Sequence, residues 1–129
     1  MVSSPAVTAA HVRNRVLFVD HEGGGRRMTA WMLNERGYEV DEVETLEQAL
    51  ASVAVGRPDF VVCNLTMGRS NAYVEGVRRI REAVGPDVPV VVYTGFVLLY
   101  EKAAREAGCS EYVVKPDHVR LLALFPPLV

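Results

Sequence analysis

Short apolar runs alternate with helix-type periods along most of the chain. Runs of this length, bounded by turn residues, predict strands, and the continuous apolar run Val88–Tyr93 fits a strand that is covered on both sides. The five predicted strands cover Arg15–Asp20, Tyr38–Val43, Asp59–Asn64, Val88–Tyr93 and Glu111–Val114.

Between these runs, apolar residues recur at the i, i+3, i+4 spacing that predicts amphipathic helices. The stripes of the first three helices are Met28, Trp31 and Met32; Leu46, Ala49, Leu50 and Val53; and Tyr73, Val77, Ile80 and Val84. Gly23-Gly24-Gly25 predicts a flexible turn before the first helix, and Thr45 is an expected cap of the second. A fourth helix ends at Ala107, and a short last helix begins after Asp117.

Alternation of strands and helices indicates an α/β fold, because parallel strands need a helical crossover between them. We expect a doubly wound (βα)5 flavodoxin-like domain, with five parallel strands and helices on both faces. The domain is predicted to cover residues 15–125, after a flexible extension over 1–14 and before a short tail over 126–129.

Polar side chains stand where the predicted strands end. Asp20 and His21 follow the first strand, Asn64 ends the third, Thr94 follows the fourth and Lys115 follows the fifth. In a parallel sheet of this kind, functional residues gather at the carboxyl ends of the strands.

With these residues in place, the chain resembles the response-regulator receiver (CheY-like) family over roughly residues 14–124. The matching stretches are VLFVDHE, RGYEVDEVETLEQAL, RPDFVVCNLTM, VPVVVYTG and GCSEYVVKP. The resemblance implies a two-component signalling module in which a histidine kinase phosphorylates an aspartate at the end of the third strand, beside a Mg²⁺ ion. It also implies that Thr94 and Lys115 stand at phosphoryl-contacting positions and Tyr112 at an aromatic switch position.

Two departures from the family pattern concern the chemistry itself. Asn64 stands at the position of the phosphoacceptor aspartate, and His21 stands where a second acidic residue is usual. A neutral amide is a weak nucleophile, and Mg²⁺ prefers carboxylate oxygens. We therefore expect a pseudo-receiver that is not an enzyme, takes no cofactor and binds Mg²⁺ weakly or not at all, with Asp20 the one weak metal candidate.

Further expectations concern the neighbours of Asp20. Lys115 can pair with Asp20 directly, Asn64 and His21 can close the pocket with hydrogen bonds, and Glu22 is expected to point elsewhere. His21 with Glu22 is a minor candidate for a transition metal. Asn64 either is a neutral replacement or locks an active-like or inactive-like conformation, and the sequence leaves this open.

Two other functions remain as alternatives to a receiver that acts by protein contact alone. One is a switchable receiver that binds phosphate or metal unconventionally, and the other is a small-ligand binding module on the same fold. No DNA-binding output domain is recognisable within residues 1–129, and the sequence leaves open whether the chain stands alone or is part of a longer protein.

The partner surface is predicted on the fourth helix, the fifth strand and the last helix. Its expected contacts are Leu98, Leu99, Tyr100 and Tyr112, and the segment Phe125-Pro126-Pro127-Leu128-Val129 is expected to add apolar surface. An exposed apolar patch of this kind favours a protein partner or a homodimer.

Composition and charge exclude several classes of protein. The formal net charge of −2 gives no basic footprint for nucleic acid or for an anionic membrane. No apolar run is long enough to cross a bilayer, and residues 1–14 do not resemble a secretory signal.

Cys63 and Cys109 are expected to be buried, reduced thiols in a cytoplasmic protein. The arginines of the third helix are expected to form a solvated face.

Overall fold

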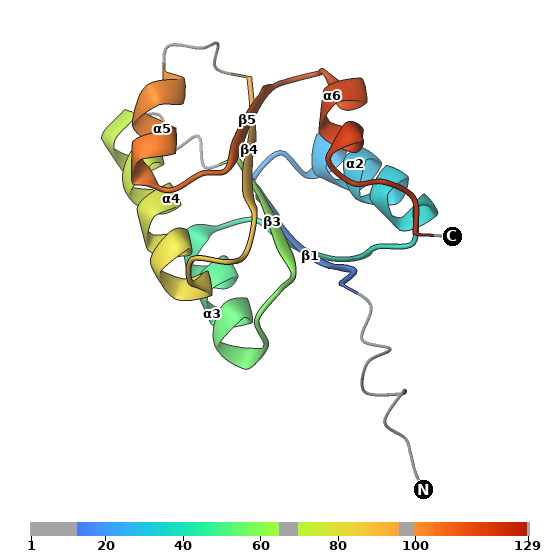
Figure 1. Ribbon diagram of the computed structural model, residues 1–129, viewed down its shortest axis with the longest axis horizontal. Helices are drawn as coiled ribbons and strands as arrows, with labels where there is room; N and C mark the ends of the chain where they lie inside the picture. The colour runs from blue at the N-terminus through green and yellow to red at the C-terminus, as the bar shows by residue number, and fades with distance from the viewer. Residues whose placement is uncertain (1–12, 65–69, 96–99, 129) are drawn as a thin grey trace, which may run out of the picture.

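The computed structural model describes residues 13–64, 70–95 and 100–128. Its five strands form one parallel sheet in the order β2-β1-β3-β4-β5 (Figure 1). The strands are β1 (Arg15–Asp20), β2 (Glu39–Val43), β3 (Phe60–Asn64), β4 (Val90–Thr94) and β5 (Glu111–Val114). The predicted fold class is confirmed, with strand boundaries that differ by up to two residues.

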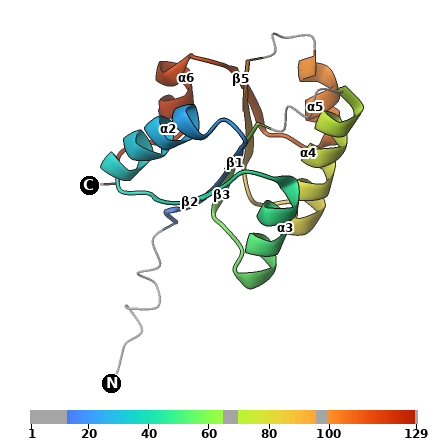
Figure 2. The same cartoon turned by 180° about the vertical axis from the view of Figure 1, so that it is seen from behind.

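Helices cover both faces of the sheet, as the two opposite views in Figure 1 and Figure 2 show. The helices α3 (Leu46–Val55), α4 (Ser70–Val84) and α5 (Glu101–Ala107) lie on one face, and α2 (Gly23–Glu35) and α6 (His118–Ala123) lie on the other. No helix of the described part of the chain is long and apolar enough to cross a membrane.

Two hydrophobic cores lie on the two faces of the sheet because successive strand side chains point in opposite directions. In β1, Leu17 and Val19 enter the core under α3, α4 and α5, whereas Val16 and Phe18 enter the core under α2 and α6. Cys63 and Cys109 are free thiols buried in the first of these cores, as expected.

The predicted stripe of the first helix is wrong. Met28 and Trp31 are 60% and 61% exposed, and the buried face of α2 consists of Arg26, Thr29, Ala30 and Leu33. These residues keep the i, i+3, i+4, i+7 period of a helix, but on a different face from Met28 and Trp31. The predicted glycine turn is also wrong, because Gly23, Gly24 and Gly25 form the first turn of α2.

The arginines of α4 do not share one solvated face. Arg78 and Arg79 are exposed, but Arg81 is half-buried. Its guanidinium donates to the carbonyl oxygens of Gly85, Val88 and Gly108 at 2.7 to 2.9 Å and to Ser110 Oγ at 3.2 Å. Arg81 therefore ties the end of α4 to the segments that lead into β4 and β5.

The end of the chain packs against α2 and β2. Phe125 is fully buried and makes edge-to-face contacts with Tyr38 and Phe60, so the expected apolar surface of this segment is wrong for Phe125, whereas Leu128 is 40% exposed. The Tyr38 hydroxyl donates to the carbonyl of Pro126 at 2.8 Å, and the Leu128 amide donates to the carbonyl of Arg36 at 2.8 Å.

The contact between Arg81 and Gly108 yields a stability prediction. Gly108 has φ of +121°, and a Cβ built there would lie 2.7 Å from Arg81 Cγ. Gly108→Ala is therefore expected to lower the free energy of unfolding by about 2 kcal/mol or more, from backbone strain and from displacement of Arg81.

The matched control is Gly24→Ala, because a Cβ at Gly24 meets nothing within 4 Å and alanine favours a helix. Urea unfolding of both variants measures the difference. Equal stabilities for the two variants would contradict the proposed contact.

Candidate functional site

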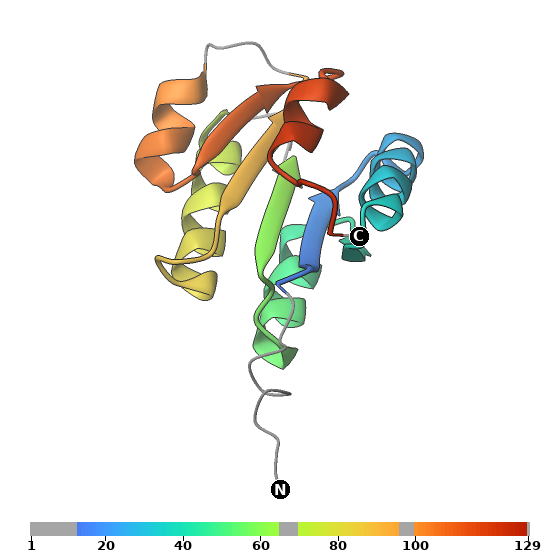
Figure 3. The ribbon, with the colours of Figure 1, turned by 45° about the vertical axis from the view of Figure 1, so that its right-hand side comes forward.

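The carboxyl ends of the strands gather the polar side chains predicted from the sequence. Figure 3 shows the arrowheads of the strands at one end of the sheet. Asp20 ends β1 and is paired in register with Asn64 at the end of β3, Thr94 ends β4, and Lys115 follows β5. Asp20, Asn64 and Thr94 are at most 1% exposed, so the polar groups lie beneath the surface.

The Asp20 carboxylate is the centre of this cluster. Its Oδ1 accepts a hydrogen bond from the Glu22 amide at 2.9 Å, and its Oδ2 accepts one from Lys115 Nζ at 2.7 Å. Asn64 Nδ2 makes a longer contact of 3.5 Å to the same Oδ2. A buried carboxylate needs such compensation, because leaving it without a cation or donors is strongly unfavourable. The expected pairing of Lys115 with Asp20 is present.

Lys115 also holds a second carboxylate. Its Nζ lies 3.0 Å from Glu22 Oε1, so the expectation that Glu22 points elsewhere is wrong. The hydrogen bond from Lys115 lowers the pKa of Glu22 below its usual value. Since the Glu22 side chain is 58% exposed, water screens this second pair and it adds little stability.

Asn64 contributes a neutral amide to the centre of the site. Its Nδ2 faces Asp20, which fixes the amide orientation, because the reverse orientation would place two oxygens together. Its Oδ1 is buried and has no hydrogen-bond partner among the residues that the structure describes. The site therefore retains one unsatisfied acceptor beside a carboxylate that is already paired.

His21 lies at the margin of the site. Its side chain is 52% exposed, and its Nδ1 is 4.0 Å from Asp20 Oδ1. Within residues 13–64, 70–95 and 100–128, no three His, Cys, Asp or Glu side chains are grouped so that they can hold a metal ion.

Tyr112 lies in the core and not on a partner surface. Its side chain is fully buried, which corrects its predicted role as a contact for a partner. Tyr100 is half-buried next to the start of α5, and Leu98 and Leu99 lie outside the described residues.

Arg26 is a site residue that the sequence reasoning missed. It is only 6% exposed, and its guanidinium donates to the Asp20 carbonyl and, at 3.0 Å, to Glu42 Oε1. Arg26 thereby links the end of β1 to β2 beneath the cluster. Its sequence signal is the helical i, i+3, i+4, i+7 spacing that it shares with Thr29, Ala30 and Leu33, but Met28 and Trp31 are more apolar and favour a different face.

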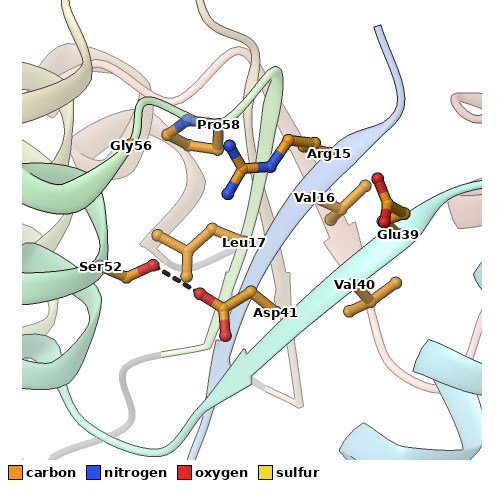
Figure 4. Close-up of a pocket in the computed structure, with 9 residues that line it drawn as sticks. All are labelled: Arg15, Val16, Leu17, Glu39, Val40, Asp41, Ser52, Gly56 and Pro58. Atoms are coloured by element: carbon orange, nitrogen blue, oxygen red, sulfur yellow. Dashed lines mark hydrogen bonds between the residues drawn. The ribbon is translucent and has the colours of Figure 1, made fainter. Parts of the chain in front are cut away.

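A separate cavity of about 260 Å³ lies toward the opposite end of the strands (Figure 4). Arg15 and Glu39, the first residues of β1 and β2, contribute to its lining, and Ser52 donates to the Asp41 carboxylate inside it. It is therefore not part of the Asp20 cluster.

Known proteins resemble this chain in sequence and in fold. The model of the response regulator receiver domain family matches residues 16–125. The response regulator MprA of Mycolicibacterium vanbaalenii is 33% identical over 103 residues, which cover 79% of this chain and 44% of that protein. The chain thus spans less than half the length of this relative.

Solved structures show the same fold. A response regulator from Burkholderia pseudomallei, crystallised with a phosphorylated aspartic acid, a calcium ion and citrate, aligns with a TM-score of 0.76 and 22% identity over 87% of this chain and 66% of its own. The chemotaxis protein CheY4 of Vibrio cholerae aligns with a TM-score of 0.74 and 24% identity over 88% of this chain and 96% of its own.

The family match extends over nearly the whole chain, and these solved structures share its fold. This chain belongs to the response regulator receiver domain family, the signalling module of two-component systems.

Proposed function

We propose that this chain is a pseudo-receiver, which takes part in two-component signalling through contacts with a protein partner and without accepting a phosphoryl group. The proposal rests on the charge and the pairing of the side chains at the carboxyl ends of the strands. The group at the end of β3 is the neutral Asn64 amide, and the Asp20 carboxylate beside it is already bound by Lys115.

Phosphoryl transfer to a receiver requires an anionic oxygen that attacks phosphorus and forms an acyl phosphate. The Asn64 side chain carries no charge, and its amide nitrogen faces Asp20. Asp20 ends a neighbouring strand, and its two oxygens accept hydrogen bonds from the Glu22 amide and from Lys115. Neither side chain therefore offers a free anionic oxygen for the attack.

The donor set also disfavours Mg²⁺. This ion requires near-octahedral oxygen coordination and is usually held by one or two carboxylates. Among the described residues Asp20 is the one fully buried carboxylate, and the Lys115 ammonium lies 2.7 Å from one of its oxygens. A second cation at this carboxylate would have to displace Lys115 or lie against its positive charge, so we expect Mg²⁺ binding to be weak or absent.

The partner surface that we propose comprises α5, β5 and α6. The strand β5 is an edge of the sheet, and edges are common sites of association. Val119 on α6 is 84% exposed, which adds an apolar contact on this side of the molecule. The proposed partner is a signalling protein or a second copy of this chain.

The first prediction concerns the Asp20–Lys115 pair. Lys115→Met removes the cation and leaves a buried carboxylate, so we expect the free energy of unfolding to fall by about 3 kcal/mol. The double variant Asp20→Asn with Lys115→Met is expected to recover most of that loss, because no unpaired charge remains.

Glu22→Gln is the matched control and is expected to cost about 0.5 kcal/mol or less, since this carboxylate is mostly exposed. Urea unfolding of the four proteins forms the test. A double variant no more stable than Lys115→Met would show that the pair does not compensate Asp20.

The second prediction concerns phosphorylation. After incubation with acetyl phosphate and Mg²⁺, the wild-type protein is expected to show no added phosphoryl group by intact mass. The variant with Asn64→Asp and His21→Asp is expected to gain one acid-stable, base-labile phosphoryl group, because it regains a nucleophile and a second carboxylate. A phosphoryl adduct on the wild-type chain would overturn the proposal and favour the switchable receiver.

A further inference from the structure

The outer face of α2 carries large apolar side chains that the domain itself does not cover. Met28 and Trp31 are 60% and 61% exposed, whereas Ala30 and Leu33 of the same helix are buried. A tryptophan is highly buried on average, and an apolar side chain left in water loses the free energy that burial against a partner would recover. The two exposed side chains are neighbours at the i, i+3 spacing, so together they favour association with another surface.

Two charged residues flank Trp31 at equal distances along the helix. Arg27 lies four residues before it and Glu35 lies four residues after it, and all three side chains are exposed. Four residues are close to one helical turn, so the three side chains lie on the same side of α2, at steps of about 6 Å along its axis. Arg27 and Glu35 are too far apart to pair within the helix, and neither makes an ion pair or hydrogen bond with any residue that the structure describes.

This order of charges is complementary to a second copy of the same helix. In an antiparallel pair of α2 helices centred on Trp31, position 27 of one copy lies level with position 35 of the other, because both are four residues from the centre. The positive Arg27 then meets the negative Glu35 of the second copy, and the two-fold symmetry of the pair makes this contact twice. A parallel pair would instead bring like charges together.

We propose that two copies of this chain associate through α2, antiparallel about Trp31. Met28 and Trp31 become buried at the centre of the interface, and Arg27 pairs with Glu35 of the second copy on either side. This surface is distinct from the one formed by α5, β5 and α6, and it does not depend on Asn64. One helix from each copy forms a small interface, so the dimer is expected to be weak, with a Kd of about 10 to 100 µM.

The test uses Trp31 as its own reporter, because it is the single tryptophan of the chain. Analytical ultracentrifugation from about 1 µM to about 1 mM spans the expected Kd. We expect the wild-type protein to pass from monomer to dimer over this range, and the Trp31 emission to shift to shorter wavelength over the same concentrations as the ring leaves water. Trp31→Glu is expected to remain monomeric, because it would bury two unpaired carboxylates at the centre.

The matched control for Trp31→Glu is Val55→Glu. Val55 is 93% exposed on α3, which covers the opposite face of the sheet from α2 (Figure 2). The control introduces the same charge at another exposed apolar position, and it is expected to dimerise as the wild type does.

Charge exchange tests the orientation of the two helices. Arg27→Glu alone and Glu35→Arg alone each place like charges opposite one another, so each is expected to raise the Kd about five- to tenfold. The double variant restores opposite charges and is expected to dimerise within about twofold of the wild type. Both exchanges place an acid near the start of α2 or a base near its end, which suits the helix dipole, so weaker dimerisation would not reflect a less stable helix.

Three results would overturn the proposal. They are a wild-type chain that stays monomeric over the whole concentration range, a dimer that survives Trp31→Glu with unchanged Trp31 emission in the wild type, and a double charge variant no tighter than the single ones. The second result would place the dimer on another surface, such as α5, β5 and α6. None of the three bears on whether the chain accepts a phosphoryl group.

Discussion

The ion pair between Asp20 and Lys115 is the interaction on which the polar cluster at the carboxyl ends of the strands depends. The two residues are 95 positions apart in sequence, and their side chains meet only when β1 and β5 lie in the same sheet with β3 and β4 between them. Asp20 is fully buried, so the fold places a charge where it is tolerated only with a partner. Lys115 supplies that partner, with its Nζ 2.7 Å from Asp20 Oδ2.

The other polar contacts at the carboxyl ends of the strands also compensate the buried Asp20. The Glu22 amide saturates the second oxygen of Asp20, the Arg26 guanidinium binds its carbonyl, and Asn64 donates toward it. A neutral amide beside a paired carboxylate avoids the repulsion that two buried carboxylates would suffer without a cation. Our proposal that the domain signals without phosphate rests on this substitution of internal pairing for an external metal and phosphoryl group.

The sequence predicted the sheet and the identity of most strand-end residues because both depend on short-range patterns. Continuous apolar runs marked the strands, and Asp20, Asn64, Thr94 and Lys115 were found by their position after those runs. The face of α2 was predicted wrongly, because hydrophobicity alone favoured Met28 and Trp31. The helix instead buries smaller side chains and Arg26, whose partners come from β1 and β2.

The roles of Arg81 and Glu22 were unpredictable for a related reason. Each depends on acceptors or donors that the tertiary fold brings near: four oxygens around Arg81, and the Lys115 ammonium beside Glu22. The Tyr93 hydroxyl, which has no hydrogen-bond partner within the described part of the chain, had no sequence signal either, since a tyrosine within an apolar strand is indistinguishable from an ordinary core residue. Such features require the packed structure.

The most direct test of the account is a titration of the wild-type protein with MgCl₂, followed through the backbone amides of Asp20, Glu22 and Lys115 by NMR, with NaCl at matched ionic strength as the reference. If the Lys115 ammonium satisfies Asp20, these resonances will move no further with Mg²⁺ than with Na⁺. A saturable shift at Asp20 that is specific to Mg²⁺ would contradict the account, because it would show that a metal site persists beside the ammonium.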